Sequence, residues 1–180
     1  MDRELDRILA EDYLDGLTDA TPAQIRILRD ECQALETQLS FLRRLVQGRH
    51  DIATGEIGRR GHGGSAADVS SLVDSLPTIL SDRIHAPGPG RMPTLLEPGD
   101  LSGRLVDELG DITQAASLDT PGEVTDGDLA RAAEQLAALE LEVSALRRSL
   151  FDRIDTLQAE LTRRYRTGET TVDDLLGGNG

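Results

Sequence analysis

Five polar side chains recur along one stretch of the sequence at spacings of 4, 3, 4 and 4 residues. They are Glu36, Ser40, Arg43, Gln47 and Asp51. On an α-helix these spacings keep side chains along one face. Arg can donate a fork of hydrogen bonds to guanine O6 and N7, and a carboxylate can accept hydrogen bonds from guanine N1 and N2. Ser is small enough for a flat base to approach the helix, so this row suits a guanine nucleotide.

The same row returns near the other end of the chain, 104 residues later (140 − 36 = 104). Its members are Glu140, Ser144, Arg147, Phe151 and Asp155, with Phe where the first copy has Gln. A Phe at this place can stack on a base. Arginines beside both copies add the local positive charge that an anionic nucleotide needs. They are Arg44 and Arg49 in the first copy, and Arg148 and Arg153 in the second.

Both copies lie on stretches with the heptad spacing of coiled-coil helices. The first stretch carries Ile25, Leu28, Cys32, Leu35, Leu39, Leu42 and Val46. The second carries Leu129, Leu136, Val143, Leu150 and Leu157, with Leu139 and Leu146 between them. Thr21-Pro22 and Thr125-Asp126 are helix starts, and Gly168 is a helix stop. The sequence therefore predicts long helices over 21–54 and 125–167.

In each helix the polar row sits one residue after the hydrophobic seam, so both rows flank the seam in the same way. One copy alone is typical of a solvated coiled-coil flank, where exposed ion pairs contribute under about 1 kcal/mol. Two copies with the same spacing and register favour a binding site on the shoulder of a helix pair.

The remaining chain is predicted as short helices and loops around this pair. A helix is expected over 1–19, broken by Gly16 and Asp19, and a flexible tail over 168–180. The loop-rich middle spans 55–124: a Gly-rich loop at 55–64, a helix at 66–82, a linker at 85–100, a short helix at about 101–109 and a loop at 110–124. The predicted fold is all-α, a single domain over 1–180 built on a long antiparallel coiled coil. Parallel packing is also possible, because the middle is long enough to cross back.

The net charge of −14 argues against non-specific nucleic-acid binding and favours a basic protein partner. The acidic N-terminal stretch and the acidic tail are either contacts for that partner or aids to solubility. Single Cys32 fits a reducing interior and, at a seam position, is expected to be a small buried hydrophobic residue. No apolar run approaches the roughly 20 residues that span a bilayer, and the N-terminus is acidic. We therefore expect a cytoplasmic protein without membrane association.

An enzyme is not expected. His50, His62 and His85 have no ligand or triad spacing, so no catalytic or metal site is predicted. The loop at 61–64 lacks the strand, Lys and Ser/Thr of a phosphate-binding loop.

The spacing Glu-x3-Ser-x2-Arg-x3-Gln-x3-Asp resembles the cyclic di-GMP signature of the RsiG family of actinobacterial anti-sigma factors. The first copy matches all five places and the second matches four, with Phe151 departing from the motif. This resemblance implies an antiparallel coiled coil that binds cyclic di-GMP, as a dimer, through both copies. It further implies that the loaded protein sequesters a WhiG-like sporulation sigma factor and so blocks transcription. The alternative is a coiled-coil adaptor or scaffold with no small ligand.

Overall fold

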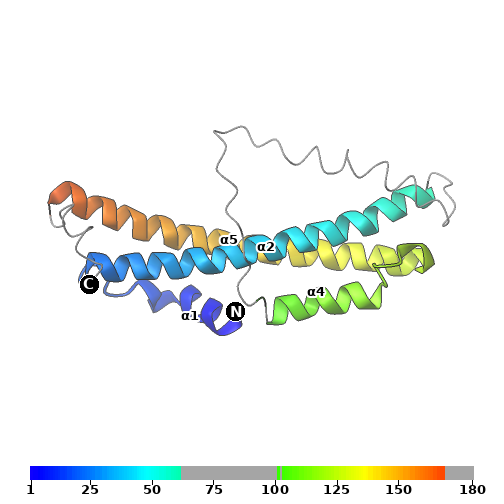
Figure 1. The fold of residues 1–180 in the computed structure, drawn as a ribbon, viewed down its shortest axis with the longest axis horizontal. Coiled ribbons are helices and arrows are strands. Elements are labelled where there is room, and N and C mark those ends of the chain that lie inside the picture. The colour runs from blue at the N-terminus through cyan, green and yellow to red at the C-terminus, as the bar shows by residue number, and fades with distance from the viewer. Residues whose placement is uncertain (62–100, 102, 169–180) are drawn as a thin grey trace. The chain divides into compact units, whose positions relative to one another are not determined.

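The computed structural model describes residues 1–61, 101 and 103–168. Its regular elements there are all helical: α1 (Asp2–Leu9), η1 (Glu11–Leu14), α2 (Pro22–Gly61), α4 (Arg104–Ala115), η2 (Pro121–Glu123) and α5 (Asp126–Thr167), as Figure 1 shows. The expected helix at 66–82, the linker at 85–100 and the tail beyond 168 lie outside the described residues.

The long helices α2 and α5 each contribute to two compact units. Unit 1 contains α1, η1, α2 up to Leu42 and α5 from Glu142. Unit 2 contains α2 from Arg43, α4 from Leu105, η2 and α5 up to Leu141. The single domain over 1–180 stays a prediction.

The two long helices run antiparallel in both units. In unit 1, Arg26 donates to Tyr165 and Arg29 donates to Gln158. In unit 2, residues later in α2 meet earlier residues of α5, as in the pairs Arg43–Glu140 and Arg60–Asp126. Residue numbers thus fall along α5 as they rise along α2, which confirms the antiparallel all-helical fold.

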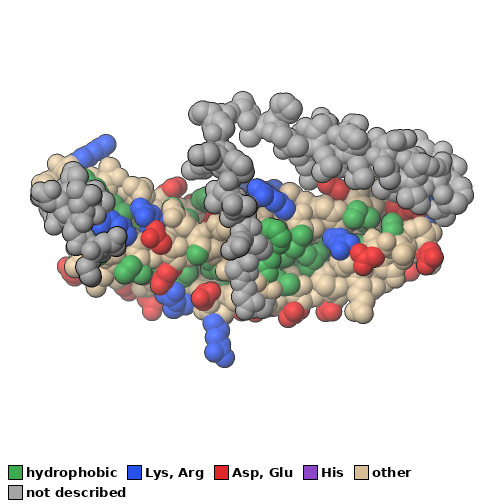
Figure 2. Space-filling model, in the orientation of Figure 1, with side chains coloured by type: hydrophobic (Ala, Val, Ile, Leu, Met, Phe, Trp, Pro, Cys, Tyr) green, Lys and Arg blue, Asp and Glu red, His purple; other side chains and the backbone are tan. Residues whose placement is uncertain are grey.

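The core consists of the predicted seams and the shorter helices that pack on them. Leu28 and Leu146 are half-buried, and the other predicted seam residues are buried. The fully buried ones include Ile25, Cys32, Leu39, Leu42, Val46, Leu129, Leu136, Val143, Leu150 and Leu157. Leu5 and Ile8 of α1, and Leu105, Leu109 and Ile112 of α4, are buried as well. On the face drawn in Figure 2, acidic and basic side chains are interspersed and hydrophobic side chains reach the surface.

Both long helices begin with a side-chain cap. The hydroxyl of Thr21 accepts from the amide of Gln24 at 3.2 Å, and the hydroxyl of Thr125 accepts from the amide of Asp128 at the same distance. These bonds satisfy amides that have no partner within the helix. At the other end of α5, Gly168 has a φ of 74°, a left-handed conformation that glycine adopts without strain.

The first long helix does not end near Thr54, and the Gly-rich loop predicted at 55–64 is wrong as far as Gly61. Gly55 and Gly58 lie inside α2, although a glycine in a helix interior costs about 1 kcal/mol relative to Ala. Burial of Ala53, together with the hydrogen bonds that Glu56 accepts from Arg59 and Arg60, offsets that cost.

Two shorter elements also differ from prediction. The helix expected at about 101–109 begins at Arg104 and continues to Ala115, so the loop predicted over 110–124 is wrong as far as Ala115. Ile112 extends the buried stripe of this helix. The helix expected over 1–19 is α1 followed by η1. It breaks at Ala10, whose backbone has a ψ of 147° and whose carbonyl, like that of Leu9, accepts from Arg153.

Candidate functional site

In unit 1, Glu36 of the first motif copy collects three hydrogen bonds on one carboxylate oxygen. Arg147 of the second copy donates through Nη2 at 2.7 Å and Nε at 3.1 Å. The hydroxyl of Ser40, one turn along α2, donates at 2.6 Å. The side chains of Glu36 and Arg147 are only 16% and 20% exposed. The guanidinium of one copy is therefore held firmly by the carboxylate of the other.

Phe151 extends this cluster along α5. The guanidinium carbon of Arg147 lies 5.6 Å from the centre of the Phe151 ring, within the range of a cation–π contact. The Phe151 side chain is exposed. Arg147 thus has a carboxylate partner on α2 and an aromatic partner on its own helix.

Unit 2 contains the reciprocal pair. Glu140 accepts from Arg43 Nη2 at 3.3 Å, and the amide of Gln47 donates to the same Glu140 oxygen. The side chains of Arg43 and Glu140 are 37% and 27% exposed, more than their counterparts in unit 1. The Nε atom of Arg43 is buried without a hydrogen-bond partner.

The remaining motif residues lie at the edges of these clusters. Asp51 is half-buried, and one of its oxygens is 3.9 Å from Nδ1 of His50. Ser144 is half-buried, and Asp155 is exposed beside a surface depression of unit 1 that Gln158 and Arg166 also line.

The additional arginines named from the sequence differ in their surroundings. Arg44 and Arg148 are exposed. Arg49 pairs with Asp119 at 2.7 Å in unit 2. In unit 1, Arg153 donates to the backbone carbonyl of Leu9 at 2.7 Å. The structure thus shows Arg153 holding the end of α1.

In each unit, then, motif residues of α2 meet motif residues of α5 on one flank of the helix pair. Unit 1 offers guanidinium, carboxylate and hydroxyl groups, and unit 2 offers guanidinium, carboxylate and amide groups. These are groups that recognise guanine edges and phosphates.

Comparison with known families bears on what this flank does. The model of the family described as RsiG-like matches residues 11–80 and 115–177, which is most of the chain. This protein belongs to the RsiG-like family. Membership implies an anti-sigma role of the RsiG type, which is regulatory rather than catalytic. No match was found among curated proteins. Among the helices described in this RsiG-like chain, none is long and apolar enough to cross a membrane.

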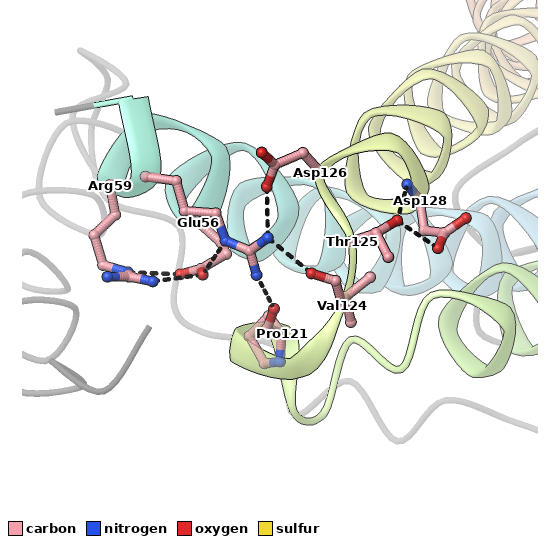
Figure 3. Close-up of polar contacts among 8 residues, drawn as sticks. Glu56, Arg59, Pro121, Val124, Thr125, Asp126 and Asp128 are labelled. Carbon is pink, nitrogen blue, oxygen red and sulfur yellow. Dashed lines mark hydrogen bonds and ion pairs between the residues drawn. The ribbon is translucent and has the colours of Figure 1, made fainter. Parts of the chain in front are cut away.

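Sequence reasoning missed a buried cluster at the end of α2 in this RsiG-like protein. Glu56, 1% exposed, lies between Arg59 and Arg60 at 2.6–2.7 Å. Arg60 also donates to the carbonyls of Pro121 and Val124, at 2.8 and 2.7 Å, and so fixes the turn before α5 (Figure 3). Hydrogen bonds from Arg59 and Arg60 lower the pKa of Glu56 to about 2. We call Glu56, Arg59 and Arg60 the Glu56 clamp.

The end of α5 repeats this construction in unit 1. Glu160 accepts from Arg163 and Arg164, and these bonds lower its pKa to about 2. Arg164 donates to the carbonyls of Leu17, Thr18 and Ala20 in the turn before α2. We call Glu160, Arg163 and Arg164 the Glu160 clamp. The offset of 104 that relates the motif copies also relates the two clamps (160 − 56 = 104), so the signal was present in the sequence.

Proposed function

We propose that this protein binds cyclic di-GMP through its two motif copies and, when loaded, sequesters a WhiG-like sporulation sigma factor to block transcription. The family supplies the anti-sigma role. What we propose beyond the family is that the ligand is cyclic di-GMP and that the sigma factor is WhiG-like.

One observation carries it: the rows predicted to act together face each other within each unit. Arg147 reaches Glu36, and Arg43 reaches Glu140. In this proposal both arginines turn to guanine edges or phosphates, the acidic residues Asp51 and Asp155 accept from guanine N1 and N2, and the serines donate to phosphate. Cyclic di-GMP binds as a dimer, which supplies enough guanines for two rows.

The ion pairs within the motif are not an obstacle to binding. The partly exposed Arg43–Glu140 pair contributes about 1 kcal/mol or less, and the less exposed Arg147–Glu36 pair costs more to separate. Micromolar binding corresponds to about 8 kcal/mol. A nucleotide that satisfies both guanidiniums can therefore displace or rearrange the pairs and still bind.

The charge of the chain supports a basic partner. At −14 it attracts the DNA-binding surfaces of a sigma factor and competes electrostatically with DNA for them. Nucleotide binding comes first and orders the surface that the sigma factor recognises.

Isothermal titration calorimetry of the full chain with cyclic di-GMP tests the ligand. We expect micromolar or tighter binding that is weakened by Arg43→Ala or Arg147→Ala alone and is lost when both arginines are replaced. Arg131→Ala is the matched control, because Arg131 is an exposed arginine of α5 that pairs within its own helix, with Asp128. Its affinity should equal that of the wild type.

Capture of purified WhiG-like sigma factor, with and without cyclic di-GMP, tests the partner. Equal capture in both conditions would refute the linkage. The alternative, a coiled-coil adaptor without a small ligand, is favoured by the fact that the motif charges already satisfy each other. No heat and an unchanged melting temperature on adding cyclic di-GMP would support it.

A further inference from the structure

The two motif copies are not equivalent in this chain, and the difference centres on Phe151. In unit 2, Glu140 accepts from both Arg43 and Gln47 on one oxygen. In unit 1, the place of Gln47 is taken by Phe151, which has no donor to offer Glu36. The ring lies beside Arg147 instead.

This difference changes what happens when each arginine leaves its carboxylate. If Arg43 turns to a ligand, Glu140 keeps the amide of Gln47 as a donor. If Arg147 turns to a ligand, Glu36 keeps only the hydroxyl of Ser40. A poorly exposed carboxylate that loses its cation is costly, so releasing Arg147 costs more than releasing Arg43.

The contacts of the two arginines also indicate that Arg147 is harder to release than Arg43. Arg147 makes two hydrogen bonds to Glu36, at 2.7 and 3.1 Å, and a ring contact. Arg43 makes one hydrogen bond to Glu140, at 3.3 Å, and its side chain is nearly twice as exposed as that of Arg147.

We infer that Phe151 is a positioning residue that retains Arg147 on Glu36, so that the α5 copy binds a guanine nucleotide more weakly than the α2 copy. This inference rests on the proposed function, because it concerns the affinity of the same motif for cyclic di-GMP. It makes the α2 copy the first to be occupied as the nucleotide concentration rises.

The two copies can be measured separately in single-arginine backgrounds. Only the α5 copy keeps its motif arginine in Arg43→Ala, and only the α2 copy keeps it in Arg147→Ala. We expect calorimetry with cyclic di-GMP to give the weaker affinity for Arg43→Ala. Adding Phe151→Gln to Arg43→Ala should tighten binding about two- to fivefold, the factor that an exposed cation–π contact corresponds to.

Two controls separate positioning from other roles. In Arg147→Ala, Phe151→Gln should have no effect, because there is no Arg147 to retain. Phe151→Leu in Arg43→Ala removes the ring without supplying an amide, so it should tighten binding less than Gln does. Phe151 is exposed, so each substitution at this residue should leave the melting temperature of its background variant unchanged.

The outcomes distinguish failure of this inference from failure of the proposed function. If Phe151→Gln tightens binding equally with and without Arg147, Gln contacts the nucleotide directly and the positioning role is wrong. If the variants bind cyclic di-GMP with affinities that do not depend on residue 151, the inference fails and the proposed function stands. If neither the wild type nor any variant binds cyclic di-GMP, both fail.

Discussion

Arg147 and Glu36 are 111 residues apart in the sequence, yet two hydrogen bonds at 2.7 and 3.1 Å join them across the helix pair. Arg43 and Glu140 make the reciprocal pair in the other unit. Each motif copy therefore supplies the cation for the carboxylate of the other. Within each unit, this pairing places motif residues of α2 beside motif residues of α5.

The distal motif carboxylates should read guanine edges. We predict that Asp51→Ala and Asp155→Ala each weaken cyclic di-GMP binding by about 1–3 kcal/mol, because each leaves guanine N1 and N2 without an acceptor. Calorimetric titration measures this. Asp152→Ala is the control, since Asp152 is an exposed acid of the same α5 turn outside the motif. Unchanged affinity in both motif variants would remove the edge-recognition argument.

The Glu56 clamp should be a major contributor to the stability of unit 2. Glu56→Ala leaves two neighbouring guanidiniums without their shared carboxylate and should lower the free energy of unfolding by roughly 3 kcal/mol. Urea denaturation measures the change. Glu134→Ala, at an exposed acid of α5, should change stability by less than about 0.5 kcal/mol. If Glu56→Ala lowers the free energy of unfolding no more than Glu134→Ala does, the Glu56 clamp contributes little to stability.

The clamps should also give an acid-dependent loss of stability. The folded-state pKa values of Glu56 and Glu160 are lowered from 4.5 to about 2. Their stabilisation is present above pH 4.5 and is lost as pH falls toward 2, because the unfolded chain takes up the protons first. Urea denaturation across this range should show a shallower pH dependence in Glu56→Gln than in the wild type. Identical pH profiles would contradict the lowered pKa of Glu56.

Arg153 offers a test of two roles. Its guanidinium bonds the carbonyls of Leu9 and Ala10, so Arg153→Ala should loosen α1. We predict faster amide hydrogen exchange over residues 2–10, and a smaller loss of cyclic di-GMP affinity than in Arg147→Ala. Unchanged exchange together with an Arg147-like loss of affinity would instead assign Arg153 to the ligand.

The hydrophobic seams were readable from sequence because heptad spacing depends only on local order. Cys32 was correctly expected in the core, where burial raises the pKa of its thiol. The contact between Glu36 and Arg147 could not be predicted from the sequence. It depends on the direction and register in which the helices meet, and the sequence left parallel packing open.

The end of α2 was mispredicted for a different physical reason. Gly55 and Gly58 favour a loop by their intrinsic preference. In the structure this end of the helix is anchored by Arg60, which donates to carbonyls more than sixty residues away, at Pro121 and Val124. A local pattern cannot supply such a contact, although the repeat of Glu56 and Arg60 as Glu160 and Arg164 marked these residues as related.

The most direct measurement of the central claim is a proton–nitrogen correlation spectrum of the arginine side chains, recorded while cyclic di-GMP is added to the full chain. We predict that the Nε–H signals of Arg43 and Arg147 both move until they reach saturation, that of Arg43 at the lower nucleotide concentration, while those of the clamp residues Arg59 and Arg163 stay in place. If saturating cyclic di-GMP leaves the signals of Arg43 and Arg147 where they are in the free protein, the motif does not bind this nucleotide.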